Sequence, residues 1–314
     1  MTLPAIGRAP SITEKARCNA AAVRPGPALQ VLENQRIIVF EIKGAATGWI
    51  ALAVRAGAPP EPIRCERTGL LIEICGDPMC GRYTMFAPPE DVARIFQLSL
   101  EEVHRVFDFR PRYNVAPSHM VAAVRVRSDA TGREPVQLRW GLVPHWAKSG
   151  DMAARTINAR AETVADKPAF RDSFRERRCL VLSTGFYEWQ KLPGRKQPHF
   201  IYLPNQEPFA FAGLWDRWEG KSGSTESCTI VTTDANRTLR PIHDRMPVIL
   251  DPEFHERWLT AGVEGRNELR ALLKPYPDDR LITHPVSTLV NKPDNDVPEC
   301  VEPVRHSHPD LFEG

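Results

Sequence analysis

Four short runs of the sequence place a reactive or hydrogen-bonding side chain among apolar or aromatic neighbours. A cysteine can act as a nucleophile, an asparagine can position a ligand, and a glutamate or a histidine can move protons. Three of these residues are each followed two positions later by an arginine. The runs are Met79-Cys80-Gly81-Arg82, Ile157-Asn158-Ala159-Arg160, Gly185-Phe186-Tyr187-Glu188-Trp189 and Ile242-His243-Asp244-Arg245-Met246.

The spacing of two residues matters because alternate residues of an extended chain point to the same face. If the three runs are strands that converge, they set a cysteine, an asparagine and a histidine among three guanidinium groups. Such a site favours an anionic ligand, and a phosphodiester is the commonest ligand of this kind. Glu188 lies between two aromatic residues, so we expect burial to raise its pKa and to suit it to proton transfer.

Each of these residues also has a purely structural interpretation. A lone cysteine is usually a small buried hydrophobe, and a glutamate between aromatic residues is more often a surface carboxylate on a strand. His243 can form a salt bridge with Asp244, and Arg160 can pair with Glu162. The histidines show no metal-ligand spacing, so we predict no zinc site and no cofactor.

The elements that must position these residues are short. Pro88-Pro89-Glu90 predicts a helix start, Ser99 to Glu102 forms a capping box before a second helix, and Leu192 to Arg195 predicts a hairpin turn. Short strands with few crossover helices favour an α+β domain around a mostly antiparallel, barrel-like β-sheet with flanking helices. We expect further strands at 121–127, 137–140, 179–182, 199–203, 209–215, 228–233 and 247–250, and helices near 167–176, 252–260 and 267–273.

Composition excludes several classes of protein. The 314 residues are 42% hydrophobic and 25% charged, which is typical of a globular protein with a real core. No run of 18 apolar residues occurs, so no membrane segment is predicted. The seven cysteines form no regular framework, which is the usage of a reducing cytosol. A net charge of +2 excludes neither a nucleic acid nor a small molecule as ligand.

The character of the sequence changes at Cys80. Residues 1–78 are interrupted by clusters of proline and glycine and show no sustained periodicity, although 36–42 and 49–54 are candidate strands. We interpret 1–78 as an N-terminal extension that is disordered, removed or not translated, and 79–314 as one domain. Cys80 is then the first residue of the working protein, exposed when Met79 is removed.

Six motifs follow one another in an order that is highly specific when they are taken together. They are Met-Cys-Gly-Arg-Tyr, Arg-Tyr-Asn-Val-Ala-Pro, Trp-Gly-Leu-Val-Pro-His-Trp, Ile-Asn-Ala-Arg-Ala-Glu-Thr, Gly-Phe-Tyr-Glu-Trp and Ile-His-Asp-Arg-Met-Pro. From Cys80 to about Pro303 the chain resembles the SRAP family, the SOS response-associated peptidases. In family members the reactive cysteine directly follows the initiator methionine. In this sequence 78 residues precede Met79-Cys80.

The resemblance implies an α+β fold that binds single-stranded DNA and captures abasic sites as a covalent adduct in the DNA damage response. The catalytic set that it implies is Cys80, Asn158, Glu188 and His243. We expect arginines to hold phosphates and aromatic side chains to stack on bases, in a DNA-binding set of Arg82, Tyr113, Asn114, Trp146, Arg160 and Arg245. The expected partner is single-stranded DNA with abasic sites. The expected state is a cytoplasmic monomer, associated with the nucleoid when bound to DNA, without a metal or a membrane.

The chemistry assigned to Cys80 needs a free α-amine. Such an amine has a reference pKa of about 7.7 to 8.0, so it is partly neutral at physiological pH and can form an imine with the aldehyde of an opened abasic sugar. The thiol then closes a five-membered thiazolidine that cannot β-eliminate. An internal Cys80 can do neither, so we expect translation to start at Met79 or the extension to be cleaved.

Two other hypotheses stay open. In the first, a hydrolase with Cys80 as nucleophile, activated by Glu188 or His243, cleaves its own leader, and abasic-site lyase activity is a further expectation. In the second, the protein is a single-strand binding module without covalent chemistry. A Cys80→Ala substitution separates them, because a pure binder keeps its affinity while a self-processing enzyme accumulates its full-length form.

Overall fold

The computed structural model describes residues 81–129, 131–220, 223–260 and 265–304, together with the backbone of five short strands before residue 73. The chain divides into two compact units, Met1–Gly76 and Asp77–Gly314. In the first unit one sheet has the order β1-β2-β3, and β4 pairs with β5. The candidate strands at 36–42 and 49–54 fall within β2 and β3. The bounds are β1 Val31–Leu32, β2 Gln35–Ile42, β3 Gly48–Arg55, β4 Ile63–Arg64 and β5 Leu71–Ile72.

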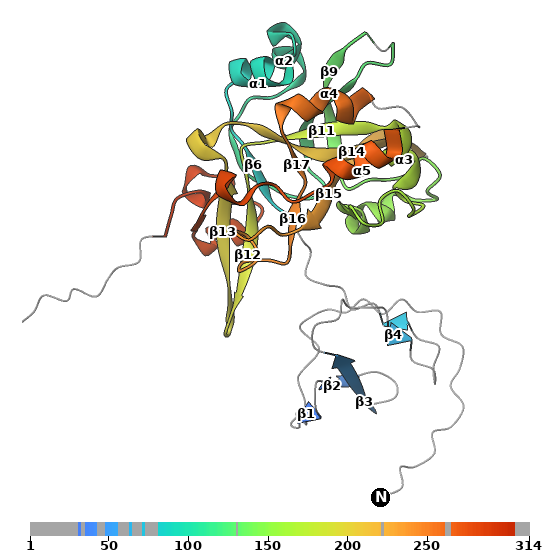
Figure 1. Cartoon of the computed structure of the whole chain (residues 1–314), viewed down its shortest axis with the longest axis vertical. Coiled ribbons are helices and arrows are strands. Elements are labelled where there is room, and N and C mark those ends of the chain that lie inside the picture. The colour runs from blue at the N-terminus through green and yellow to red at the C-terminus, as the bar shows by residue number, and fades with distance from the viewer. Residues whose placement is uncertain are drawn as a thin grey trace, which may run out of the picture. The chain divides into compact units, whose positions relative to one another are not determined.

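A closed five-stranded barrel forms the centre of the second unit (Figure 1). Its strands follow the order β15-β9-β8-β11-β14, and β14 pairs back to β15. The pairing of β9 with β15 is parallel and the other four pairings are antiparallel. The bounds are β8 Met120–Val126, β9 Arg133–Trp140, β11 Arg178–Ser183, β14 Phe209–Gly220 and β15 Gly223–Asp234. The predicted α+β class with a barrel-like sheet is therefore confirmed.

Three short strands extend the barrel at its edges. β10 (Asn158–Arg160) lies parallel to β15, β16 (Arg245–Pro247) lies antiparallel to it, and β17 (Ile249–Leu250) pairs with β14. The single strand predicted at 247–250 is thus divided between two partners. Thr232 of β15 pairs with both β10 and β16, so these two strands flank it on opposite sides.

A second, antiparallel sheet has the order β18-β13-β12-β6-β7. Its long β12–β13 hairpin runs away from the end of the unit where α1 and α2 lie (Figure 1). Leu192 pairs with Arg195 across a two-residue turn, and Gly194 supplies the positive φ of 74° that this turn needs, so the predicted hairpin is confirmed. The bounds are β6 Tyr83–Met85, β7 Arg112–Val115, β12 Gly185–Leu192, β13 Arg195–Tyr202 and β18 Ile282–Pro285.

Alternation along the strands divides the core into layers. On β11, Cys179 and Val181 pack in a cluster shared with the second sheet, while Leu180 and Leu182 pack under the helices. A strand buried on both faces reads as a continuous apolar run, which is why 179–182 shows no alternation in sequence. The predicted core positions of Cys179 and Cys228 are confirmed, since both are fully buried.

The helices cover the outer side of the barrel. α1 begins at the predicted proline and buries Val92 and Phe96. α2 follows Ser99, but the serine side chain makes no capping hydrogen bond, so the capping box is wrong in that detail. α3 is shorter than the predicted 167–176 because the chain before it forms turns. The bounds are α1 Pro89–Phe96, α2 Leu100–Val106, α3 Arg171–Glu176, α4 Pro252–Thr260 and α5 Arg266–Leu272.

One buried arginine ties β16 to the neighbouring strands. The Arg245 guanidinium donates to both carboxylate oxygens of Glu162 (2.7 and 2.9 Å), to Asp234 (2.6 Å) and to the carbonyl oxygen of Thr232 (2.8 Å). Its side chain is 9% exposed, whereas Glu162 is half exposed. Burial is the largest single influence on the pKa of Glu162 and would raise it, but the hydrogen bonds from Arg245, a backbone N–H and the charges of Arg245 and Arg160 together hold that pKa below its ordinary value.

Substituting Glu162 tests this network. A carboxyl group with a lowered folded pKa contributes stability above its unfolded pKa, about 4.3, and loses it as the pH falls through the folded pKa. Glu162→Gln should therefore lower the free energy of unfolding at pH 7, by up to about 1 kcal/mol because the group is half exposed, and the deficit should shrink towards pH 3. Urea unfolding at both pH values measures it, with exposed Glu207→Gln as the control. A deficit that does not change with pH would contradict the assignment.

Gly185 is a point where β12 has no room for a side chain. A Cβ there would lie 2.4 Å from two ring carbons of Phe200 and 2.9 Å from the carbonyl oxygen of Ile201. We expect Gly185→Ala to cost about 1–3 kcal/mol of stability through overpacking, measured by denaturant unfolding. Gly150→Ala is the matched control, because its nearest new contact is a ring carbon of Trp218 at 3.9 Å. Equal effects of the two substitutions would show that the close contact is relieved at no cost.

Candidate active site

The strand that follows Cys80 lies against β12, which carries Glu188. β6 and β12 are antiparallel, and beyond the last ladder pair the N–H of Tyr187 donates to the carbonyl oxygen of Arg82 at 3.0 Å. Glu188 directly follows Tyr187 on β12. Cys80 itself lies outside the residues that the structure describes. The residue before the predicted glutamate is thus hydrogen-bonded to the residue two positions after the predicted cysteine.

Glu188 is buried, with 2% of its surface exposed, so the interpretation of it as a surface carboxylate is wrong. On its other side it pairs with His199 of β13, whose Nε2 lies 3.2 Å from Oε1 of Gln190. Burial, followed by the neighbouring His284, lowers the pKa of His199 and favours its neutral form. The carboxyl group therefore lies in a desolvated environment beside a neutral imidazole, and its expected raised pKa stays a prediction.

His243 lies in the loop that leads into β16, and its side chain is 10% exposed. Its Nδ1 accepts the backbone N–H of Arg245 at 3.1 Å and lies 3.0 Å from Oδ1 of Asp244. A neutral ring held in this way carries its proton on Nε2, and a protonated ring can pair with the aspartate. Gln190 of β12 donates to the carbonyl oxygen of Pro241, which ties this loop to the strand of Glu188 (3.2 Å).

Asn158 begins β10, and its partly buried side chain alternates with buried Ala159 and exposed Arg160, as a strand predicts. β10, which begins at Asn158, and β16, which follows the loop of His243, lie on opposite sides of β15. The i, i+2 pattern is therefore present in β10. It does not hold around His243, because that residue lies in a loop before β16 begins.

An aromatic contact connects the start of β6 with the start of β10. The Tyr83 ring packs against the Trp140 ring with centroids 5.3 Å apart. The indole N–H of Trp140 donates to the carbonyl oxygen of Ile157 at 2.9 Å, directly before Asn158. Together with the pairing of β6 with β12 and the hydrogen bond from Gln190 to the His243 loop, this contact links the four predicted catalytic segments where the second sheet meets the barrel.

Trp146 is a large aromatic side chain presented to solvent, with 47% of its surface exposed. The turn that carries it is braced by buried Asp216, whose carboxylate accepts the backbone N–H of His145 at 3.0 Å and lies 3.0 Å from Nδ1 of the same residue. Arg177 also pairs with Asp216 (3.1 Å). An exposed ring on a fixed turn is suited to stacking on a base.

The predicted phosphate contact of Arg245 is turned towards the protein. Arg245 is buried and its guanidinium is engaged by Glu162 and Asp234, so its predicted phosphate contact is replaced by a role in holding β16. We expected Arg160 to pair with Glu162, but the hydrogen-bonded partner of Glu162 is Arg245. Arg160 is exposed on β10 and keeps its place in the predicted DNA-binding set.

The predicted DNA contacts from the Arg-Tyr-Asn motif also face inwards. Asn114 is fully buried and has no surface to offer a nucleic acid, so we replace its predicted DNA contact with a positioning role. Tyr113 stacks on Phe86, with ring centroids 5.2 Å apart, and is partly buried. The Arg82 guanidinium donates to Asn114 and to two backbone carbonyl oxygens, which leaves its expected phosphate contact a prediction.

Sequence reasoning did not single out several polar residues that support the site. His199 and Gln190 lie on the same face of the second sheet as Glu188, and the position of Gln190 two residues after Glu188 was the available signal. The carboxylates of Asp216 and Asp296 accept hydrogen bonds from backbone N–H groups of residues far away in the sequence. No local pattern predicts such contacts.

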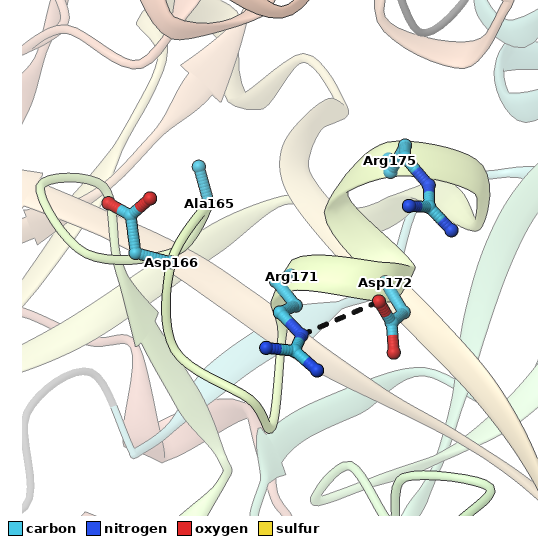
Figure 2. A pocket seen from close by; sticks show the side chains of 5 residues that line it. All are labelled: Ala165, Asp166, Arg171, Asp172 and Arg175. Carbon is cyan, nitrogen blue, oxygen red and sulfur yellow. Dashed lines mark ion pairs between the residues drawn. The ribbon is translucent and has the colours of Figure 1, made fainter.

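Surface hollows do not mark this site. Figure 2 shows the side chains that line a hollow at α3, two arginines and two aspartates together with Ala165. The volume of this hollow is about 380 Å³. A larger hollow of about 440 Å³ lies at β6, β7 and the loop after α2. Of the ten predicted site residues, none lines the first hollow and none lines the second. In the described part of the chain, no cluster of three or more residues is suited to a metal ion, and no helix is long and apolar enough to span a membrane.

The comparisons with known proteins agree on the region that contains the site. The family model described as "SOS response associated peptidase (SRAP)" matches residues 79–293. The abasic site processing protein YoqW of Bacillus subtilis is 40% identical over 226 residues, which covers 71% of this chain and 99% of that protein. The abasic site processing protein HMCES of Xenopus tropicalis is 33% identical over 262 residues, covering 71% of this chain and 78% of that protein.

A solved structure shows the same fold. The crystal structure of a protein from Bacteroides thetaiotaomicron superposes with a TM-score of 0.63 at 31% sequence identity, and the match covers 72% of this chain and all of that one. YoqW and the Bacteroides protein are thus each matched over almost their whole length by about seven tenths of this chain. With the family model matching well over half of the sequence, the chain belongs to the SOS response associated peptidase family.

Proposed function

We propose that this protein, once its chain begins at Cys80, binds single-stranded DNA and captures abasic sites as a covalent thiazolidine. The relatives named abasic site processing proteins support the class of substrate. The observation that carries the proposal is the pairing of β6 with β12, in which the N–H of Tyr187, the residue before buried Glu188, donates to the carbonyl oxygen of Arg82, two positions after the cysteine. A desolvated carboxyl group beside an N-terminal aminothiol is suited to imine chemistry.

The proposed reaction joins one protein and one abasic site and releases one water. The Cys80 amine attacks the C1′ aldehyde of the opened deoxyribose, and the carbinolamine loses water to give an imine. The thiol sulfur then adds to the imine carbon while its proton moves to the nitrogen. Because the product is a saturated ring, it lacks the imine that would drive β-elimination of the 3′ phosphate.

The neighbouring side chains have roles that follow from their contacts. Glu188 takes and returns protons at the carbinolamine and imine steps. His243, whose Nδ1 accepts a backbone N–H, presents Nε2–H as a donor to the ring oxygen of the opening sugar. Asn158 positions the amine or the sugar through its amide. Trp146 stacks on a base beside the lesion, and exposed Arg160 holds a flanking phosphate.

The amine requires a chain that starts at Cys80. The family match begins at residue 79, and YoqW is matched over 99% of its own length by 71% of this chain, which supports a working protein shorter than the full sequence. A start at Met79 followed by removal of the methionine would expose the amine, and so would cleavage of the preceding segment. Self-cleavage by Cys80, with Glu188 as base, is the alternative enzyme activity, and abasic-site lyase activity belongs to the same proposal. We further propose a cytoplasmic monomer that acts in the DNA damage response.

The crosslink itself is the first prediction. The full chain, a chain begun at Met79 and its Cys80→Ala variant are each incubated with single-stranded DNA that carries one abasic site, and products are resolved on a denaturing gel. We expect a denaturation-resistant adduct from the Met79 chain and none from Cys80→Ala. We also expect Cys80→Ala to keep its affinity for undamaged single strands.

Two outcomes separate the alternatives. A protein that binds single strands but never forms an adduct is a non-covalent binding module. A full chain that is shortened to Cys80 during expression, while its Cys80→Ala variant stays full length, supports self-cleavage. An adduct formed by a chain that retains Met1 would remove the thiazolidine mechanism.

The role of Trp146 gives a second prediction. Removing a base-stacking ring costs about 1–3 kcal/mol, so Trp146→Ala should weaken binding to undamaged single-stranded DNA by roughly 5- to 150-fold. Fluorescence anisotropy with a labelled oligonucleotide at one fixed salt concentration measures the dissociation constant. Ile282→Ala is the control, because Ile282 is exposed to a similar degree (41%) without an aromatic ring. Equal losses in both variants would argue against stacking.

A further inference from the structure

The C-terminal strap, which we define as residues 286–304, covers the face of the second sheet that is turned away from the barrel. Val286, Val290 and Cys300 pack there against Tyr187 of β12 and Phe200 of β13. An isolated bridge between Val286 and Pro303 closes the strap on itself. Tyr187 directly precedes Glu188, so the strap is the packing partner of the strand that carries the proposed proton-transfer residue.

Asp296 fastens the strap to β7. Its Oδ1 accepts the backbone N–H groups of Tyr113 and Asn114, the latter at 2.9 Å, and its Oδ2 accepts Nε–H of Arg112. β7 is the last strand of its sheet, so these N–H groups have no further strand to pair with. One carboxylate therefore satisfies two backbone donors and a guanidinium, which are charge-assisted hydrogen bonds of the stronger kind.

Asn114 carries this attachment to the strand after Cys80. Its buried Nδ2 lies within 3.1 Å of the carbonyl oxygens of Val290, Lys292 and Asn295, all on the strap. Its Oδ1 accepts a hydrogen bond from the Arg82 guanidinium at 3.0 Å. The buried amide is thus bonded to the strap on one side and to the start of the second sheet on the other.

Arg82 completes the connection between the strap and the strand of Glu188. Its guanidinium donates to the carbonyl oxygens of Val290 (2.7 Å) and Asn291 (3.2 Å), while its own carbonyl oxygen accepts the N–H of Tyr187. The indole N–H of Trp189 donates to Oδ1 of Asn291 at 2.8 Å. Residues on both sides of Glu188, and the residue two positions after Cys80, are therefore held by the same short segment.

From these contacts we propose that Asp296 is a positioning residue for the covalent reaction, acting through Asn114 and Arg82 to hold the strand after Cys80 in register with Glu188. The inference rests on the proposed function and deepens it. Asp296 lies three residues beyond the end of the family match at 293, which includes only the first part of the strap. Its loss leaves the exposed DNA-contacting groups unchanged and misplaces the reacting groups.

Separating the rate of reaction from DNA affinity tests the proposal. Wild type, Asp296→Ala and the control Asp108→Ala are compared in the full chain and in a chain begun at Met79, the region to which YoqW corresponds in full. Asp108 is a suitable control because it also accepts a backbone N–H and a guanidinium Nε–H, both from Arg110, within its own exposed loop. The rate of crosslinking to abasic-site DNA is measured against DNA concentration.

For Asp296→Ala we expect the rate at saturating DNA to fall roughly 10- to 100-fold, since displacements of about 1 Å cost this much, while the half-saturating concentration stays unchanged. Asp108→Ala should match wild type in both. Arg82→Lys should also slow the reaction, and the double variant should be no slower than the slower single variant, because both substitutions break one connection.

The outcomes that overturn the inference differ from those that overturn the proposed function. A wild type that forms no adduct overturns both. A wild type that reacts, with Asp296→Ala reacting equally fast or with effects that multiply in the double variant, overturns the inference alone. If Asp296→Ala does not fold, Asp296→Asn replaces it, because its amide oxygen can still accept the two backbone N–H groups while the pairing with Arg112 is lost. We then expect a smaller loss of rate, and a wild-type rate refutes the role.

Discussion

The antiparallel register between β6 and β12 is the constraint on which the rest of the structure depends. It brings the backbone of Arg82 into a hydrogen bond with Tyr187, the residue before buried Glu188. One face of β12 packs on the barrel and the other packs under the C-terminal strap. A slip of one residue would exchange these faces and turn the carboxylate away from the barrel, so the packing of both layers protects the chemistry.

Buried polar groups in this fold are used to hold elements together. Arg245 and Asn114 lie in motifs that suggest ligand contacts, yet each donates several hydrogen bonds to the protein's own acceptors. Leaving such groups unpaired would cost more than the hydrogen bonds gain, so their partners are as fixed as the core. Exposed residues have a different role. Trp146 and Arg160 remain available to a nucleic acid on elements that these buried contacts keep in place.

Local patterns in the sequence predict local structure well. The prolines before α1 and the turn at Leu192 to Arg195 each act within a few residues, and both predictions are confirmed. Closure of the barrel depends on a parallel pairing of Arg139 with Ser227, which no local signal announces. The direction in which each arginine side chain points could not be predicted either. A spacing of two residues fixes the face of the strand on which a side chain lies, but it does not identify the acidic residue with which the arginine pairs. The motifs supplied Asn158, Glu188 and His243 as candidates, and their catalytic roles stay predictions.

The most direct test of the account is the intact mass of the protein–DNA adduct, measured before and after treatment with borohydride. The account predicts a chain that begins at Cys80 plus the DNA less one water, with no change on reduction, because a thiazolidine contains no imine to reduce. An adduct that gains two hydrogens would be an open imine. That result, or an adduct whose chain still begins before Cys80, would contradict the central claim.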